Sequence, residues 1–335
     1  MLSRRKFLQR CLTAPFVLKE ISSQTRQINT VLGAVNPARL GKTLIHEHVL
    51  VDFIGADKIN PDRWEHEKVI RRVLPFLKEI KAKGIQSIVE CTPAYLGRDV
   101  LLLQKLSRLS GLNILTNTGY YGASDNKYLP KQAFTETAEQ LAERWINEFY
   151  QGIDNTEVKP GFIKISVNPG SLSTLHQKLV VAAGLTHLET GLTICSHTGP
   201  SLPAFEEIAI LDELGVHPSA FVWVHARSTN ENDFLKAAKM GVWISLDGIS
   251  KDNLAQNASI LQLLKSHNLL NRALISHDAG WYKPGEENGG EFRGFTTITD
   301  HFIPLLKTKA FTEEDIKQLI IINPAEVFTI KKRKL

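Results

Sequence analysis

The feature that most constrains the fold of this chain is a regular alternation between short apolar runs and longer amphipathic segments. Eight runs rich in β-branched residues occupy residues 43–50, 85–91, 113–118, 161–167, 192–197, 220–225, 242–247 and 273–277. Segments with helical spacing lie between or after them, at residues 67–83, 99–110, 135–152, 177–190, 203–214, 230–240 and 253–269. Strands that alternate with helices pair in parallel through right-handed crossovers, and eight such repeats close most simply into a (β/α)8 barrel.

An open doubly wound sheet is the alternative arrangement for the same alternation. It offers no reason for eight strands, and no Gly-x-Gly-x-x-Gly turn follows the first run. No low-complexity linker interrupts residues 27–330. We therefore predict a single α/β barrel domain over residues 27–330, since barrels of roughly 250 residues fold as one unit.

Positive charge is concentrated at the two ends of the chain. Residues 1–26 contribute +5 and residues 331–335 contribute +4 to a net charge of +5, so the residues between them carry −4. A negatively charged body argues against a nucleic-acid-binding surface, and no apolar run reaches the roughly 18 residues that a membrane span needs. We expect a small-molecule substrate, no nucleic acid and no membrane span, with a short basic tail at 331–335.

The N-terminal segment, residues 1–26, begins with the sequence Ser-Arg-Arg-Lys-Phe-Leu at 3–8, followed by a modest apolar patch at 11–18. This arrangement resembles the twin-arginine export signal, because adjacent arginines before Phe-Leu suit an address that a receptor reads. The alternative is an ordinary basic terminus. We expect a signal segment, the twin-arginine export machinery as a partner, and a periplasmic or otherwise exported protein.

The first apolar run carries two histidines, His46 and His48, one residue apart. Side chains at positions i and i+2 of a strand point to the same side, so these imidazoles would aim at one point. A lone His-x-His is more often a pair of buried, hydrogen-bonded histidines. Four more residues of ligand type stand near the ends of later runs: Lys164, His197, His225 and Asp278. The C-terminal ends of barrel strands meet at one rim, so we expect all six side chains to form one site.

The residue types at these positions indicate a metal site. Neutral imidazoles and a carboxylate bind zinc and similar divalent metals, whereas a lysine ammonium has no lone pair to offer. Lys164 stands among large apolar residues, and burial would favour the neutral amine, which can react with carbon dioxide to give a carbamate. A carbamate has two oxygens and could bridge two cations roughly 3.5–4 Å apart that share one water. We predict two divalent metal ions, with zinc as the first expectation, although these ligands also accept Mn, Co or Fe.

These residues and their neighbours resemble the phosphotriesterase family of the amidohydrolase superfamily, including its lactonase-related members. The motifs that carry the resemblance are Thr43–His48, Phe162–Ile165, Ser196–Thr198, Val224-His225 and Ile275–Asp278. The resemblance implies that His46, His48 and Asp278 hold one metal and that His197 and His225 hold the other. It further implies that Lys164, as N6-carboxylysine, and a hydroxide bridge both metals, and that Asp278 is the catalytic proton acceptor.

Around these ligand positions the sequence departs from the family pattern. Family phosphotriesterases and lactonases commonly carry an aspartate three residues after the last histidine ligand, where this chain has Ser228. Lactonases tend to place an arginine after the Leu-Asp pair of the seventh strand, where Gly248 stands here. Tyr121 occupies the position of the tyrosine that touches the metal site in lactonases. We therefore expect the metals to be retained and the substrate preference to be altered.

Candidate substrate contacts come from the loops. Residues 279–295 are rich in glycine and aromatic residues, which suits either a mobile lid or a plain flexible loop. The candidate contacts are Tyr121, Arg227, Trp281, Tyr282 and Arg293. The two arginines could meet an anionic substrate group or could be surface ion-pair partners. His277 should point away from the metals, because it alternates with Asp278.

We predict from these features a metal-dependent hydrolase that cleaves an ester or a lactone. A phosphotriester or an N-acyl amide is the alternative substrate within the same chemistry. The alternative of another class is a ligand-binding barrel without catalysis, in which the metals support the structure. Asp278 argues against that alternative, because the metals could be held without a group suited to proton transfer. The resemblance also suggests a possible homodimer.

Overall fold

The computed structural model describes residues 26–335, and the predicted signal segment lies almost wholly outside the described residues. The barrel strands in it pair in parallel, in two arcs with the orders β12-β3-β4-β5 and β6-β7-β8-β9-β10-β11. Their bounds are β3 (Thr43–Leu50), β4 (Ser87–Glu90), β5 (Asn113–Leu115), β6 (Asn117–Thr118), β7 (Phe162–Ser166), β8 (Thr193–His197), β9 (Phe221–Val224), β10 (Trp243–Leu246), β11 (Ala273–Ile275) and β12 (Gly280–Tyr282).

The two arcs join at both ends to make one barrel. Only Thr116 separates β5 from β6, so the chain carries the first arc directly into the second. At the other junction the backbone N–H of Asp278 donates to the carbonyl of His46 at 3.1 Å, and that of His48 donates to Ala279 at 2.9 Å. β5 with β6, and β11 with β12, each occupy one strand position, which confirms the predicted (β/α)8 barrel.

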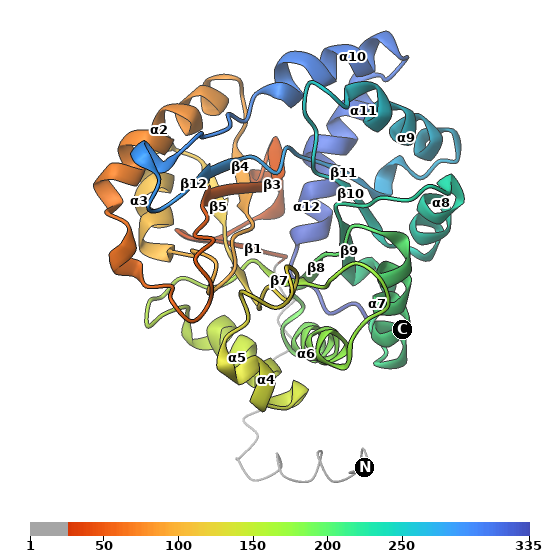
Figure 1. Ribbon diagram of the computed structural model, residues 1–335. Coiled ribbons are helices and arrows are strands. Elements are labelled where there is room, and N and C mark those ends of the chain that lie inside the picture. Colours follow the sequence, from red (N-terminus) through yellow and green to blue (C-terminus); the bar gives the residue numbers. More distant parts are fainter. Residues whose placement is uncertain (1–25) are drawn as a thin grey trace, which may run out of the picture.

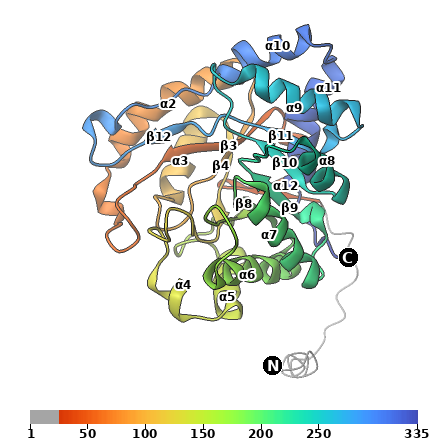
Figure 2. The same cartoon turned by 45° about the vertical axis from the view of Figure 1, so that its right-hand side comes forward.

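Helices form a ring outside the strands (Figure 1). Those from α2 to α9 follow chain order around the barrel, whereas α12 lies at the centre of this view, across one end of the barrel. Their bounds are α2 (His66–Ala82), α3 (Val100–Ser110), α4 (Lys131–Thr135), α5 (Ala138–Gln151), α6 (Thr174–Thr190), α7 (Ser201–Glu213), α8 (Glu231–Met240), α9 (Leu254–Ser266), α10 (Ile303–Thr308), α11 (Glu313–Lys317) and α12 (Asn323–Phe328). Neighbouring helices such as α6 and α7 lie side by side, next to β8 (Figure 2). Within residues 26–335 no helix has the length and apolar character needed to cross a bilayer.

The helix predicted at residues 135–152 is α5, and a short helix that was not predicted, α4, ends at the first residue of that range. Thr137 begins a new helix, since its hydroxyl accepts from the backbone N–H of Gln140 and the Gln140 side chain accepts from the backbone N–H of Thr137. This reciprocal capping satisfies two free N–H groups at the start of α5. The residue before it, Glu136, is extended and ends α4.

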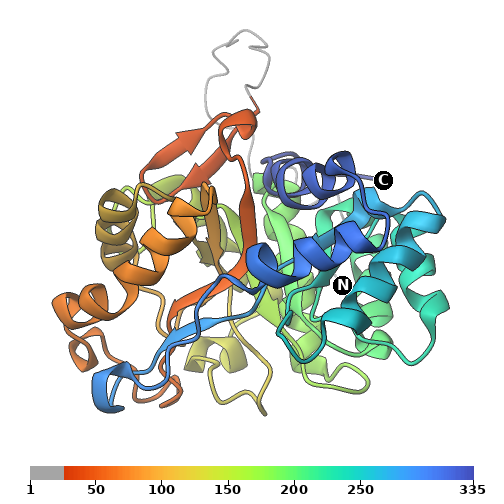
Figure 3. The same ribbon diagram turned by 90° about the horizontal axis from the view of Figure 1, so that it is seen from above.

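The first and the last of the described residues cover the side of the barrel at which the strands begin. An antiparallel hairpin, β1 (Ile28–Thr30) with β2 (Gly33–Val35), and α12 lie at this end, while the connection after β12 lies at the other (Figure 3). Residues 331–335, expected to be a basic tail, are instead packed onto the barrel. The backbone N–H of Lys331 donates to Gly191 at 3.0 Å, and the Arg333 side chain is buried.

Hydrophobic packing occurs in two layers. One cluster lies between the strands and the surrounding helices, and a smaller one fills the barrel interior with residues such as Val89, Phe162, Val222 and Leu274. The inner cluster ends below Lys164, the buried lysine of β7. Above that level lies the candidate site, a cavity lined by ligand-type side chains together with apolar ones such as Val51 and Leu96.

Candidate metal centre

The six ligand-type residues predicted from the sequence line one cavity of about 120 Å³ at the C-terminal ends of the strands. They are His46, His48, Lys164, His197, His225 and Asp278. His46 and His48 belong to β3, Lys164 to β7 and His197 to the end of β8, so strand alternation places their side chains inside. His225 and Asp278 follow β9 and β11 in left-handed backbone, with φ of 55° and 51°. Such φ values are uncommon outside glycine and here turn both side chains toward the cavity.

The imidazoles converge on the carboxylate of Asp278. Its Oδ1 lies 3.1 Å from His48 Nε2 and 3.7 Å from His46 Nε2, and its Oδ2 lies 4.0 Å from His225 Nε2. The ring of His197 lies 4.3 Å from that of His225, centroid to centroid. Ligand atoms of His46, His48 and Asp278 all lie within 4.8 Å of one another, a spacing that one metal ion could span.

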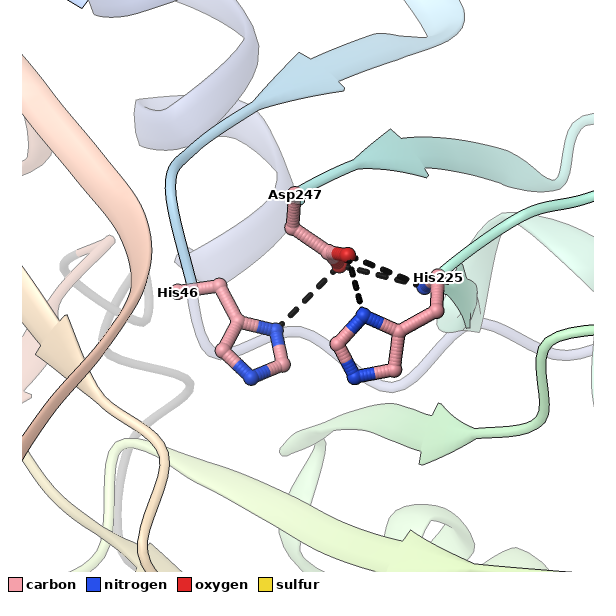
Figure 4. A group of neighbouring side chains, drawn as sticks. All are labelled: His46, His225 and Asp247. Atoms are coloured by element: carbon pink, nitrogen blue, oxygen red, sulfur yellow. Dashed lines mark hydrogen bonds and ion pairs between the residues drawn. The ribbon is translucent and has the colours of Figure 1, made fainter. Parts of the chain in front are cut away.

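A buried carboxylate, Asp247, orients two of these imidazoles from behind (Figure 4). Its oxygens lie 3.2 Å from His46 Nδ1 and 2.6 Å from His225 Nδ1. Burial alone would raise the pKa of Asp247, but the two histidines outweigh it and hold the pKa well below its usual range. The ionised Asp247 accepts from both Nδ1–H groups, which leaves each Nε2 with a free lone pair.

His48 is oriented in the same way by a hydroxyl. The Oγ1 of Thr92 lies 2.8 Å from His48 Nδ1 and donates to Glu90 Oε1 at 2.5 Å. A hydroxyl has one hydrogen, so Thr92 accepts from His48 Nδ1–H, and the Nε2 lone pair faces the cavity. The hydroxyl beside His197 is that of Tyr121, which lies 3.3 Å from both ring nitrogens and so does not select one of them.

Lys164 lies between these groups without a hydrogen bond. Its side chain is 1% exposed, and Nζ has no partner among the described residues. Burial, and secondly the charge of Lys164, lower the pKa of His46 to about 3, so this imidazole is neutral. A buried amine without a partner is costly. Neutral imidazoles, a carboxylate and an amine that can become a carbamate together fit a pair of divalent cations.

The predicted substrate contacts divide into two groups. Tyr121 and Trp281 line the cavity, and burial raises the pKa of Tyr121, which keeps the phenol neutral. Arg293 is exposed and does not line the cavity, but it adjoins two lining residues at the rim: its Nη1 donates to the carbonyl of Asp278 at 3.2 Å and its guanidinium lies 5.8 Å from the centre of the Trp281 ring. Tyr282 and Arg227 do not line the cavity: Tyr282 lines an outer groove beside α2, and Arg227 is exposed.

The segment expected to be a lid or flexible loop begins with regular structure. Residues Gly280–Tyr282 form β12, which pairs in parallel with β3. Gly280 has φ of 99°, and a Cβ there would lie 1.8 Å from the carbonyl oxygen of His48. Only glycine permits this close approach, so the first part of the segment is a wall of the barrel.

Several supporting residues were not predicted from the sequence. Four buried residues support the metal-site imidazoles or the strands that carry them: Asp247, Glu90, Thr92 and Glu207. Of these, only Asp247 stood at a position, the end of a strand, that could have indicated its role from the sequence. Glu47, between the two histidines of β3, accepts from His277 Nδ1 at 2.6 Å. His277 thus lies outside the cavity lining, and so does Ser228, which donates to Asp233 at 2.5 Å.

Known proteins resemble this chain over most of its length. The model of the phosphotriesterase family matches residues 26–328. The phosphotriesterase homology protein of Escherichia coli (strain K12) is 29% identical over 293 residues, covering 86% of this chain and 98% of that protein. An aryldialkylphosphatase from Saccharolobus solfataricus is 28% identical, covering 87% and 95%. An N-acetyltaurine hydrolase from Xenopus tropicalis is 26% identical, covering 93% and 100%.

The solved structures agree with this relationship. The organophosphorus hydrolase from Deinococcus radiodurans superposes with a TM-score of 0.82 at 26% identity, covering 94% of this chain and 100% of that one. The Escherichia coli phosphotriesterase homology protein, solved with phosphate in its active site, gives 0.75 at 28% identity, covering 87% and 99%. With nearly the whole barrel matched by the family model, and the fold matched by these structures, the chain belongs to the phosphotriesterase family.

Proposed function

We propose that this protein is a hydrolase that uses two divalent cations, zinc in the first instance, to cleave an ester or a lactone. The observation that carries the proposal is the convergence of four imidazoles, Asp278 and the unpartnered Lys164 on one small cavity. Three of the imidazoles present their Nε2 lone pair inward because of their hydrogen bonds at Nδ1. Relatives named as hydrolases and phosphatases support the reaction class.

In this proposal His46, His48 and Asp278 would hold one cation, His197 and His225 would hold the other, and Lys164, as N6-carboxylysine, would be a ligand to both. Two cations bound there supply Lewis acidity and lower the pKa of a water that they share. The amine of Lys164 has no competing hydrogen bond among residues 26–335, which favours its conversion to a carbamate.

Asp278 is the proposed proton acceptor. Burial alone would raise its pKa, but the imidazoles of His48 and His46 beside it outweigh burial and keep the pKa below its usual range. The group is therefore a carboxylate at neutral pH and can take up a proton at one of its oxygens. Tyr121 and Trp281, which line the cavity, orient the substrate beside it.

An N-acyl amide with an anionic group is the second candidate substrate. The N-acetyltaurine hydrolase relatives support it, since taurine carries a sulfonate. Arg293 supports it as well, because no carboxylate of the described residues forms an ion pair with this guanidinium at the rim. Arginine binds planar and tetrahedral oxyanions through parallel N–H groups.

A substrate panel with metal analysis tests the proposal. The protein is loaded with zinc, its metal content is measured, and hydrolysis of lactones, aryl esters, phosphotriesters and N-acyl amines is followed. We expect about two cations per chain and turnover of an ester or lactone. Asp278→Asn should lower kcat by about 10²–10⁴-fold. A metal-loaded protein that turns over no substrate class would instead support a ligand-binding barrel without catalysis.

We also propose that residues 1–26 direct export through the twin-arginine machinery. The paired arginines of the sequence, Arg4 and Arg5, support this proposal. Replacing both with lysine should retain the protein in the cytoplasm, while the wild-type chain fractionates with the periplasm. Equal distribution of the two chains would exclude the proposal.

A further inference from the structure

We infer that Asp247 couples the two proposed cation positions by determining which nitrogen of His46 and of His225 carries the proton. The inference rests on the proposed function, in which these two histidines belong to different cations. It makes Asp247 a positioning residue, because its carboxylate contacts ligands and not the cations or the substrate. Asp247 directly follows β10, and its side chain is fully buried.

All acceptor positions of Asp247 are used by four donors. Oδ1 accepts from His225 Nδ1–H at 2.6 Å, and the backbone N–H of His225 is shared between Oδ1 at 3.1 Å and Oδ2 at 3.2 Å. Oδ2 accepts from the Ser245 hydroxyl at 2.5 Å and from His46 Nδ1–H at 3.2 Å. Both imidazoles therefore turn the opposite nitrogen, Nε2, toward Asp278.

A cation between Asp247 and the two histidines is the alternative explanation of this cluster, since the three residues could present ligand atoms to one ion. The distances argue against it. Ligand atoms bound at about 2.0–2.1 Å to one tetrahedral ion lie roughly 3.3 Å apart. The 2.6 Å between Asp247 and His225 is too short for that arrangement and is the length of a charge-assisted hydrogen bond.

The donors on the two oxygens differ in a way that predicts the effect of Asp247→Asn. The backbone N–H of His225 reaches both oxygens and so does not distinguish them. At Oδ1 an amide NH2 would find one partner able to become an acceptor, His225 Nδ1. At Oδ2 it would meet the Ser245 hydroxyl, which can rotate to accept, and His46, which can change tautomer. The amide nitrogen therefore takes the Oδ2 place and donates to His46 Nδ1. The His46 proton moves to Nε2, and the lone pair that faced the cation is lost.

The expected consequence is selective. Asp247→Asn should remove the cation held by His46, His48 and Asp278 and retain the one held with His225. Metal content should fall from about two per chain to about one. A residue with a general structural role would lower both occupancies and the thermal midpoint together.

The test reads the tautomers directly, in metal-free protein labelled with ¹⁵N-histidine at pH 8. Long-range ¹H–¹⁵N spectra should show wild-type His46 and His225 both as Nδ1–H tautomers, with assignments from His46→Gln and His225→Gln. In Asp247→Asn, His46 alone should become Nε2–H. Asp315→Asn, a matched change at the cap of α11, should alter neither the tautomers nor the metal content.

Each outcome decides the inference. An Nε2–H tautomer at either histidine of the wild-type chain would overturn it without any variant, so a poorly folding Asp247→Asn would not leave it undecided. An Asp247→Asn chain that keeps both cations would overturn the coupling alone. A wild-type chain that takes up no divalent cation would overturn the proposed function, and the coupling with it, whatever the tautomers are.

Discussion

At the scale of single residues, Lys164 is the side chain whose chemistry depends most on its surroundings. A buried amine without a hydrogen bond costs about 1–3 kcal/mol, so its presence in a packed barrel calls for a compensating interaction. A carbamate shared by two cations would supply that interaction. Removal of the amine should therefore not destabilise the metal-free protein, but it should weaken zinc binding.

Lys164→Met provides this comparison. The metal-free variant should be as stable as wild type, or more stable by about 1–3 kcal/mol, because an apolar side chain replaces the unpaired amine. The same variant should bind fewer zinc ions and lose most of its hydrolytic activity. Thermal unfolding in chelator, metal analysis and ¹³C spectra after incubation with labelled bicarbonate measure these effects. Lys239→Met, at an exposed position of α8, is the control. Unchanged zinc content in Lys164→Met would contradict the bridging role.

Arg293 is the second single residue whose surroundings predict its role. Its guanidinium lies at the rim, and its partners there are a backbone carbonyl and an aromatic ring. Arg293→Ala should raise KM for an anionic N-acyl substrate by about tenfold, corresponding to about 1.4 kcal/mol, and leave KM for a neutral lactone nearly unchanged. Steady-state kinetics on both substrates measures the difference. Arg227→Ala is the matched control, since Arg227 is exposed and does not line the cavity. Equal effects on both substrates would exclude recognition of an anion.

At the scale of elements, the contact between α7 and β8 holds the strand that carries His197. Glu207 of α7 is buried and accepts from the hydroxyls of Ser196 and Thr198, which flank that histidine. Burial raises the pKa of Glu207 to about 7, against a usual 4.5, so the folded chain holds this proton more tightly than the unfolded chain. The stability that Glu207 contributes is therefore fully present below pH 4.5 and is lost as pH rises through 7.

Glu207→Gln removes this titration. The variant should unfold at nearly the same temperature as wild type at pH 5, where Glu207 is neutral in the folded chain. At pH 8 the variant should be the more stable of the two, because it avoids burying an ionised carboxylate. Thermal unfolding of metal-free protein across this pH range measures the effect, with exposed Glu213 changed to glutamine as control. A stability difference that does not vary with pH would refute the account.

At the scale of the whole molecule, the C-terminal residues complete the end of the barrel opposite the site. The buried guanidinium of Arg333 donates to Thr193 Oγ1 at 3.0 Å and to the carbonyl of Val327 at 3.1 Å, which ties β8 to α12. Burial lowers the pKa of Arg333 to about 10, so the group remains charged at neutral pH. The basic end of the chain is thus part of the fold.

Arg333→Ala should accordingly destabilise the protein by about 2–4 kcal/mol, because buried carbonyl groups lose their donors. Zinc content and kcat at 25 °C should stay as in wild type, since the cavity is at the other end. Chemical denaturation, with metal analysis of the folded protein, measures both properties. Lys332→Ala, at the exposed neighbouring position, should change stability little. A large loss of zinc in Arg333→Ala without a loss of stability would contradict this assignment.

Local patterns in the sequence predicted the strands and the ligand positions well. Apolar β-branched runs located the barrel strands, because a strand buried on both faces is apolar along its whole length. Within such a run a polar residue such as His46, His48 or Lys164 is conspicuous, and its place near the end of the run indicates the rim. The short helix α4 was missed because its five residues are too few to show a helical pattern beside the longer α5.

The sequence by itself determined the alternation of strands and helices, and hence a barrel with its ligand-type residues at one rim, because burial and strand alternation act over a few neighbouring residues. Only the tertiary structure decided that Asp247 serves both His46 and His225, that Gly280–Tyr282 closes the barrel against β3, and that Arg333 is buried. Each of these contacts joins positions far apart in the chain. Such contacts depend on how the elements pack around the barrel, and no short stretch of sequence records that packing.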